Sequence, residues 1–255
     1  EGGENGEPLE GKERTEILIQ LRKQAHKEGI WLPHMPEEWG GMGLGHVELA
    51  MVQAEAAKSY YGPWVFNCQA PDEGNMHTLL HWATPEQAEK YLKPLCHGTT
   101  WSCFAMTEPE VAGSDPTLIQ TNAYEDGDEW VINGSKYYIS GAGDPRCKVM
   151  ITMVQTDPDG PPHRRQSQIL VPIDAPGLTI DHPMQVFGDD DAPHGHMHLT
   201  FEECRVPYDN ILLGEGRGFE ISQLRLGPGR IHHCMRSIGA AERAIEMMAR
   251  RGLNR

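Results

Sequence analysis

The order of apolar and polar positions begins with a helical zone. Apolar residues recur at helical spacing over 17–25, ahead of a stop at Gly29, and again over 47–57. Thr84 followed by Pro85 marks another helix start, because proline is favoured in the first turn of a helix. The first hundred residues are therefore predicted to be mainly helical.

The middle of the chain changes to short β-rich runs separated by Gly, Asp and Pro clusters. These runs occupy residues 99–107, 130–140, 148–154, 167–173 and 196–201. Asn133-Gly134 predicts a hairpin turn inside the second run. Tyr137 and Tyr138 are predicted to point to opposite faces of a strand, with Ser140 on the face of Tyr138. Strands at this spacing without intervening helices predict an antiparallel barrel or sandwich.

Helical character returns after Gly218, where an apolar stripe runs to the end of the chain. Its members are Ile221, Leu224, Ile231, Met235, Ile238, Ala241, Ile245 and Met248. Such a stripe needs further helices to pack against, so we expect a helical domain that continues past Arg255. We predict an α+β chain with a partial N-terminal helical domain at 1–98, a middle antiparallel β-barrel domain at 99–213 and the first helix of a C-terminal helical bundle at 214–255.

Composition narrows the class of protein. The 255 residues carry a net charge of -15, which disfavours nucleic acid as a partner because that binding depends on clustered Lys and Arg. No apolar stretch approaches the roughly 20 residues of a membrane span, and no signal peptide is visible. The six cysteines form no CxxC pair, which fits buried thiols in a reducing, intracellular setting better than a disulfide framework.

The segment FAMTEPEVAGSD at 104–115 is the first candidate for a ligand-binding site. It ends a β-run and turns through Pro109 and Gly113, and glycine permits positive φ and close approach of the backbone to a ligand. Thr107 and Ser114 supply hydroxyls on either side. The turn can cradle a phosphate or a polar ring edge without net positive charge. An ordinary β-turn with a capped end is the alternative.

Two further segments can contact a ligand. INGSKYYISGAG at 132–143 offers a tyrosine that can stack on a planar cofactor, unless its tyrosines are one core and one surface residue. LGPGRIHHC at 226–234 carries Arg230, which can neutralise a ligand phosphate. An ion pair at a helix start is the alternative for that arginine.

A metal site is a third possibility. His194, His196 and His198 alternate along a β-run, and three histidines on one face can hold zinc or iron. However, Pro193 and Gly195 disturb the strand, and no further ligand is spaced to complete a familiar set. We therefore predict no metal. The carboxylates of 189–193 are predicted to form a solvated loop.

At these segments the sequence resembles the acyl-CoA dehydrogenase family, in order and over nearly the whole chain. FAMTEPEVAGSD resembles the family's Thr-Glu-Pro…Gly-Ser-Asp signature, with one extra residue in the turn, and YYIS resembles its second flavin segment. VPYDNILLGEGRGF at 206–219 resembles the exit from the β-domain. DAPHGH and GPGRIHHCMR resemble the branch of family members 10 and 11. The family folds as a helical domain, a β-barrel and a four-helix bundle.

The resemblance implies roles for individual residues. FAD would be bound by the two flavin segments, through Phe104, Met106, Thr107, Gly113, Ser114, Tyr138, Ile139 and Ser140. Ser114 would also meet the CoA part of the substrate, and Gly227, Pro228, Gly229 and Arg230 would contact the substrate near the helix start. Tyr138 stands where many members have tryptophan, and Ser140 where they have threonine.

The catalytic base implied by the family is not found in this chain. Some members carry a glutamate just before the arginine, but that position is Gly229 here. We therefore expect the base beyond Arg255, and we expect residues 1–255 alone to be inactive.

The implied reaction is FAD-dependent α,β-dehydrogenation of a medium- to long-chain fatty acyl-CoA in fatty acid β-oxidation. Electrons would leave to an electron-transfer flavoprotein, and the protein would form a homodimer or homotetramer. It would work in the bacterial cytoplasm, or in a mitochondrion or peroxisome of a eukaryote. The alternatives are a flavin oxidase or hydroxylase of the same fold, a non-catalytic acyl-CoA or flavin binding module, and a metal-binding β protein.

Overall fold

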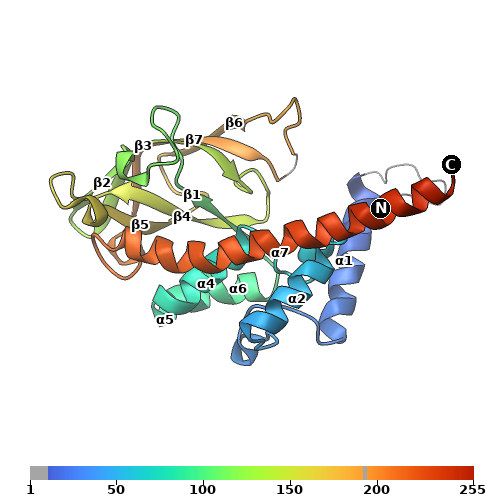
Figure 1. Cartoon of the computed structure of the whole chain (residues 1–255). Helices are drawn as coiled ribbons and strands as arrows, with labels where there is room; N and C mark the ends of the chain where they lie inside the picture. The colour runs from blue at the N-terminus through green and yellow to red at the C-terminus, as the bar shows by residue number, and fades with distance from the viewer. Residues whose placement is uncertain (1–10, 192–193) are drawn as a thin grey trace. The chain divides into compact units, whose positions relative to one another are not determined.

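The computed structural model describes residues 11–191 and 194–255, which form two compact units (Figure 1). One unit comprises the described residues up to Glu73 together with Pro228–Arg255, and the other is Gly74–Gly227. Across these described ranges, no helix combines the length and the apolar character that a membrane crossing requires.

The first unit is helical, as its apolar spacing predicts. Its elements are α1 (Gly11–Lys27), the 3-10 turn η1 (Glu37–Trp39), α2 (His46–Ala56), α3 (Gly62–Val65) and the part of α7 (Gly218–Leu253) from Pro228 onward. The predicted helices at 17–25 and 47–57 are confirmed as α1 and α2, and Gly29 follows α1 with a φ of +71°. Arg22 joins α1 to the end of α3 by hydrogen bonds to the Trp64 carbonyl and to Asn67.

A glycine allows α7 to approach α2 closely in this unit. A Cβ placed on Gly239 would lie 2.0 Å from the carbonyl oxygen of Ala54, a separation that no side chain can occupy. Lys58, just after α2, lies 3.4 Å from the Glu242 carboxylate on the next turn of α7. The backbone contact at Gly239 therefore fixes how these two helices pack.

The second unit opens with short helices and continues into a sheet. Its helical elements are α4 (Asp72–Trp82) from Gly74 onward, α5 (Pro85–Gln87), the π turn η2 (Ala88–Leu92), α6 (Lys93–Cys96), the 3-10 turns η3 (Pro116–Leu118), η4 (Pro162–Arg164) and η5 (Tyr208–Asn210), and the first residues of α7. The predicted helix start at Thr84 is confirmed, because Thr84 and Gln87 form a reciprocal capping box. The Gln87 amide also donates to the Asp209 carbonyl at 2.6 Å, which ties these helices to the end of the sheet.

Seven strands form one curled sheet, a half-barrel. They are β1 (Trp101–Ala105), β2 (Asn122–Asp126), β3 (Glu129–Ser140), β4 (Cys147–Gln155), β5 (Gln166–Pro172), β6 (Leu178–Pro183) and β7 (His196–Pro207). The order is β1-β4-β2-β3-β7-β6, with β5 also paired to β4. The predicted fold class is confirmed. The sheet is mixed, however, because β1 and β2 both pair with β4 in parallel.

The core of the second unit lies within the curl of the sheet. β4 and β5 are almost continuously buried, which is typical of strands covered on both faces, and β5 buries the polar residues Gln166, Ser167 and Gln168 ahead of its apolar ones. Trp130, Ile132, Met150, Leu199 and Phe201 are among the buried side chains that pack together there. All six cysteines are unpaired thiols, and Cys234 alone among them is exposed.

The predicted hairpin at Asn133-Gly134 is wrong. β3 runs unbroken through both residues, and the turn between β2 and β3 lies at Gly127 instead. Asn133-Gly134 occupies a β-bulge against β7, where a Cβ on Gly134 would lie 2.6 Å from the Thr121 hydroxyl. The dipeptide therefore serves a close backbone approach rather than a chain reversal.

The predicted alternation of Tyr137 and Tyr138 is also wrong. The pairing of β3 with β7 shifts between Lys136 and Ile139, and Tyr138 has a φ of +55°. The two tyrosine rings contact each other, with their centroids 5.0 Å apart, rather than lying on opposite faces. An irregularity of this kind re-aims side chains near the end of a strand.

The close packing at Gly239 generates a stability prediction. Gly239→Ala should lower the free energy of unfolding by about 1–3 kcal/mol, because the added methyl forces α7 away from Ala54. Gly229→Ala is the matched control on the same helix, since a Cβ there meets no atom within 4 Å. It should be neutral or stabilise by up to about 1 kcal/mol. Urea unfolding followed by tryptophan fluorescence measures both, and equal midpoints for the two variants would contradict the packing described.

Candidate functional site

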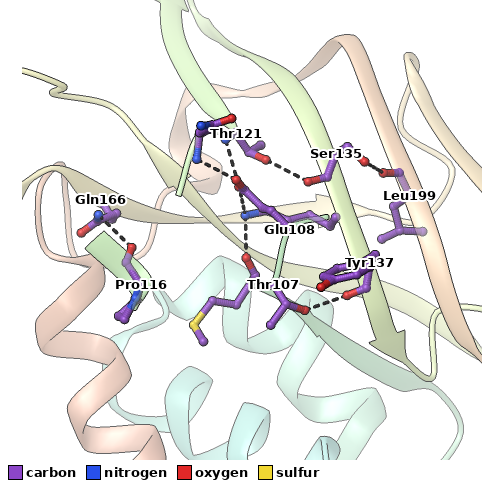
Figure 2. Close-up of polar contacts among 11 residues, drawn as sticks. Thr107, Glu108, Pro116, Thr121, Ser135, Tyr137, Gln166 and Leu199 are labelled. Carbon is purple, nitrogen blue, oxygen red and sulfur yellow. Dashed lines mark hydrogen bonds and ion pairs between the residues drawn. The ribbon is translucent and has the colours of Figure 1, made fainter. Parts of the chain in front are cut away.

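The two segments singled out at 104–115 and 137–140 lie side by side (Figure 2). The Tyr137 amide donates to the Thr107 carbonyl at 3.0 Å, and the Thr107 hydroxyl donates to the Tyr137 carbonyl at 2.7 Å. This pair of bonds fixes the end of β1 beside β3. Because the hydroxyl proton of Thr107 is committed to Tyr137, its oxygen can only accept a hydrogen bond from a ligand.

The turn that follows Thr107 offers unused backbone donors. Between Thr107 and Ser114, no backbone N–H donates a hydrogen bond to another residue in the part of the chain that the structure describes. The turn folds back on itself, since a Cβ on Gly113 would lie 3.2 Å from the Thr107 methyl group. It ends at the exposed Ser114, after which Asp115 caps η3. Unused amides and a hydroxyl around a glycine turn can receive an anion or the acceptor atoms of a polar ring.

A buried ion pair holds this turn against the sheet. Lys136 on β3 has a fully buried side chain, and its ammonium donates to the Met106 carbonyl at 2.9 Å and to the Glu108 carboxylate at 2.8 Å. Glu108 in turn accepts from the backbone amides of Gln120 and Thr121, at 2.7 and 2.9 Å. Figure 2 shows Glu108 reaching from the turn toward Thr121. One lysine and one glutamate therefore anchor both ends of the segment from Met106 to Thr121.

The environment shifts the pKa of both partners. Burial lowers the pKa of the Lys136 ammonium to about 8, although the Glu108 carboxylate opposes the shift. Burial alone would raise the pKa of Glu108, but the Lys136 ammonium and the donors at Thr121 and Gln120 hold it below its ordinary value. The carboxylate is therefore ionised at neutral pH and serves as an anchor.

An arginine covers the Phe104 ring. The Arg225 guanidinium lies 4.0 Å from the ring centroid, and its Nε donates to Asn75 at 3.0 Å. Asn75 donates in turn to the Ser102 hydroxyl on β1, at 2.9 Å. The guanidinium and the ring are close enough for a cation–π interaction. This network fixes Phe104 from the side of α4 and α7.

The second candidate segment presents three different side chains. Tyr138 is 42% exposed, so its ring is available to a ligand. Ile139 is 2% exposed and belongs to the core of the sheet, so it can meet a ligand only through its backbone. The Ser140 hydroxyl lies 2.8 Å from Nδ1 of His196. Their role as cofactor contacts stays a prediction.

The three histidines of 194–198 are engaged with different neighbours. His194 packs edge-on to Trp101, and burial lowers its pKa. His196 contacts Ser140, whereas His198 contacts the Asp181 carboxylate at 2.8 Å. Over residues 11–191 and 194–255, no three His, Cys, Asp or Glu side chains are grouped so as to hold a metal ion. His196 instead lies between Ser140 and Asp191, and His198 lies between Ser135 and Asp181.

The predicted substrate residues are divided between the two units. Ser114 and Gly227 belong to the second unit, and Pro228, Gly229 and Arg230 belong to the first. The predicted place near the helix start is wrong, because α7 begins at Gly218 and these residues lie well inside it. Arg230 is exposed and forms no ion pair with another described residue, so the alternative of a helix-start ion pair is not observed. Their contact with substrate stays a prediction.

Several residues of the site are not predicted by the sequence pattern. Lys136 and Glu108 gave no signal of burial, although a lysine inside the apolar run 130–140 was a visible irregularity. Arg225 similarly interrupts the apolar stripe of the last helix. A charged residue at a position where the strand or helix pattern calls for an apolar one was the available signal. Such a residue is buried only when its charge is paired.

The buried ion pair generates a stability prediction. Lys136→Met should lower the free energy of unfolding by about 3–5 kcal/mol, because it leaves the Glu108 carboxylate buried without its cation. Lys148→Met is the matched control, since Lys148 lies on β4 but is exposed, and it should change stability by less than about 0.5 kcal/mol. Urea unfolding measures both. A Lys136→Met protein as stable as the control would show that the pair does not anchor the turn.

The same pair predicts a dependence on pH. Because the pKa of Glu108 is lowered in the folded state, its contribution to stability is complete above the unfolded value of 4.5 and is lost as the pH falls. Glu108→Gln removes that titration, so its stability should fall less steeply than that of the parent protein below pH 4.5. Unfolding curves at a series of acidic pH values test this. Parallel pH profiles for the two proteins would be the contrary result.

Known proteins resemble both the helical and the β-rich part of this chain. Residues 103–204 match the acyl-CoA dehydrogenase middle domain, and residues 7–99 match the acyl-CoA dehydrogenase N-terminal domain. Acyl-CoA dehydrogenase family member 10 of Mus musculus is 48% identical over 94% of this chain, which covers 23% of that protein. The probable acyl-CoA dehydrogenase FadE2 of Mycobacterium tuberculosis is 46% identical over 94% of this chain, which covers 58% of FadE2.

A solved structure agrees in three dimensions. A putative acyl-CoA dehydrogenase from Mycobacterium abscessus superposes with a TM-score of 0.90 at 45% identity, over 93% of this chain and 58% of that one. This chain thus spans less than two thirds of the length of these relatives. The agreement in sequence extends through both the helical and the β-rich regions, and with it the chain belongs to the acyl-CoA dehydrogenase family.

Proposed function

We propose that this chain forms the flavin-binding part of an enzyme that converts medium- to long-chain fatty acyl-CoA to trans-2-enoyl-CoA with FAD. The observation that carries the proposal is the pair of hydrogen bonds between Thr107 and Tyr137. They bring together the two segments that the family uses for flavin, in a chain that belongs to that family.

The residues present fit FAD. The unused amides between Thr107 and Ser114 match the acceptor atoms of a flavin ring edge and a diphosphate. The exposed ring of Tyr138 can stack on the flat ring, and the Ser140 hydroxyl can contact its edge. We therefore assign the cofactor to Phe104, Met106, Thr107, Gly113, Ser114, Tyr138, Ile139 and Ser140, with Ile139 acting through its backbone.

The chemistry divides between the cofactor and the protein. When bound, FAD supplies the acceptor for the β-hydride of the acyl group. The chain's own residues orient that ring through Thr107, Tyr138 and Ser140, and the buried Lys136–Glu108 pair keeps their backbone in place. Such placement lowers the activation barrier because the reacting groups are already held in the required distance and orientation.

The α-proton requires a base and a stabilised enolate. A C–H beside a thioester is far too weak an acid for a free carboxylate, so preorganised donors must stabilise the enolate oxygen. A dry pocket also raises the pKa of a carboxylate base toward neutrality. Gly229 occupies the place where some relatives have a glutamate, so we assign the base to a carboxylate outside residues 1–255.

The partners follow from the same assignment. The substrate is a fatty acyl-CoA, contacted by Ser114 and by the stretch from Gly227 to Arg230. The electrons pass to an electron-transfer flavoprotein, and the protein works as a homodimer or homotetramer. The reaction belongs to fatty acid β-oxidation inside the cell.

The test uses the intact protein that carries this chain. Purified without added cofactor, it should be yellow, and a fatty acyl-CoA added without oxygen should bleach the flavin and yield the 2-enoyl-CoA. Thr107→Val should weaken FAD binding by roughly tenfold, since it loses a hydrogen bond to Tyr137 worth about 1 kcal/mol or slightly more. Thr179→Val, at an exposed position of β6, is the control and should bind FAD normally.

Other outcomes identify the alternatives. Rapid peroxide formation in air would indicate an oxidase, and bound flavin that no acyl-CoA reduces would indicate a binding module. A colourless protein that takes up no FAD would overturn the proposal altogether.

A further inference from the structure

Ser140 and His196 form a pair across the neighbouring strands β3 and β7. Ser140 ends β3, His196 begins β7, and the two residues are partners in the antiparallel register. The Ser140 hydroxyl lies 2.8 Å from Nδ1 of His196. The backbone holds the pair on both sides, since Gly141 N donates to Gly195 O at 3.0 Å and Met184 N donates to His196 O at 2.7 Å.

The second ring nitrogen of His196 lies near a carboxylate. Nε2 of His196 lies 3.7 Å from an oxygen of Asp191, which is longer than a hydrogen bond but within the range of an electrostatic interaction. A carboxylate on that side favours the tautomer that carries its proton on Nε2. In that tautomer Nδ1 has a lone pair, to which the Ser140 hydroxyl at 2.8 Å donates its proton.

This arrangement determines what Ser140 can offer a ligand. A hydroxyl has one proton and two lone pairs, so a serine that donates to histidine can only accept from a third group. Reduction of a flavin adds hydrogen to nitrogen at the edge of the ring, which changes an acceptor there into a donor. A Ser140 that is held as an acceptor therefore favours the reduced ring over the oxidised ring.

We propose that His196 is a positioning residue that holds the Ser140 proton and thereby raises the reduction potential of the bound flavin. The inference rests on the proposed function, because it needs FAD beside Ser140. It also gives a role to the HGHMH segment that a metal site would otherwise have explained. His196 acts through Ser140 and does not itself touch the substrate.

The chain contains its own matched control. His198, two residues along β7, has a similar set of partners, with Ser135 at 3.0 Å and Asp181 at 2.8 Å. Ser135 lies on β3 but is not among the predicted flavin residues. Removing the His198 imidazole should therefore disturb the strand to a similar extent without reaching the cofactor.

The experiment compares reduction potentials of the FAD-loaded intact protein by anaerobic dye titration. His196→Leu and Ser140→Ala should each disfavour reduction by roughly tenfold, which is about 30 mV for a two-electron couple. The double variant should show no further shift, because both changes remove the same interaction. His196→Asn should restore the parent potential, since its side-chain oxygen can accept the Ser140 proton. His198→Leu should match the parent protein.

Each contrary result has a distinct meaning. A parent protein that takes up no FAD would overturn the proposed function, and the inference with it. A His196→Leu protein that holds FAD at the parent potential would overturn the inference alone. Equal shifts in His196→Leu and His198→Leu would also overturn it, because they would indicate a general disturbance of β7. Loss of FAD from both leucine variants would also overturn it. If His196→Leu alone loses FAD, the Ser140→Ala protein must show the lowered potential, and a parent-like potential there would overturn the inference.

Discussion

The candidate site depends on one buried interaction, the ion pair of Lys136 and Glu108. A buried ammonium is tolerated only where its charge and its protons are satisfied, and here Glu108 and the Met106 carbonyl supply the partners. The carboxylate is satisfied in turn by the amides at Gln120 and Thr121. A loop that must satisfy all of these groups has little conformational freedom, so the exposed residues that follow Glu108, up to Ser114, are held in place.

Irregularities in β3 complete the site. A regular strand would send Tyr137 and Tyr138 to opposite faces and would pass Asn133-Gly134 without a bulge. The two shifts in its pairing with β7 instead let the backbone approach Thr121 and turn the Tyr138 ring outward. Bulges near a binding site re-aim side chains at some cost in regular pairing. The strand thus combines a buried core face with a polar end at Ser140 and His196.

Features of the fold that depend on local periodicity could be predicted from the sequence. Features that depend on contacts between residues distant in sequence could not. The helices at 17–25 and 47–57, the capping box at Thr84 and five of the strands follow from spacing and turn chemistry. β2 and β6 were not predicted because they are short and largely exposed, with little apolar alternation. Asn133-Gly134 was misread because the same dipeptide serves a turn or a bulge, and only the neighbouring Thr121 decides between them. The motifs located both candidate segments, but their hydrogen bonding and the Lys136–Glu108 anchor depend on contacts distant in sequence.

The most direct measurement of the central claim is an experimental structure of the intact protein with FAD and an acyl-CoA. The flavin ring is expected between the turn after Thr107 and the strand end at Ser140, with its diphosphate on the amides that lead to Ser114. A ring bound elsewhere, or side chains packed into the space between those two segments, would contradict it.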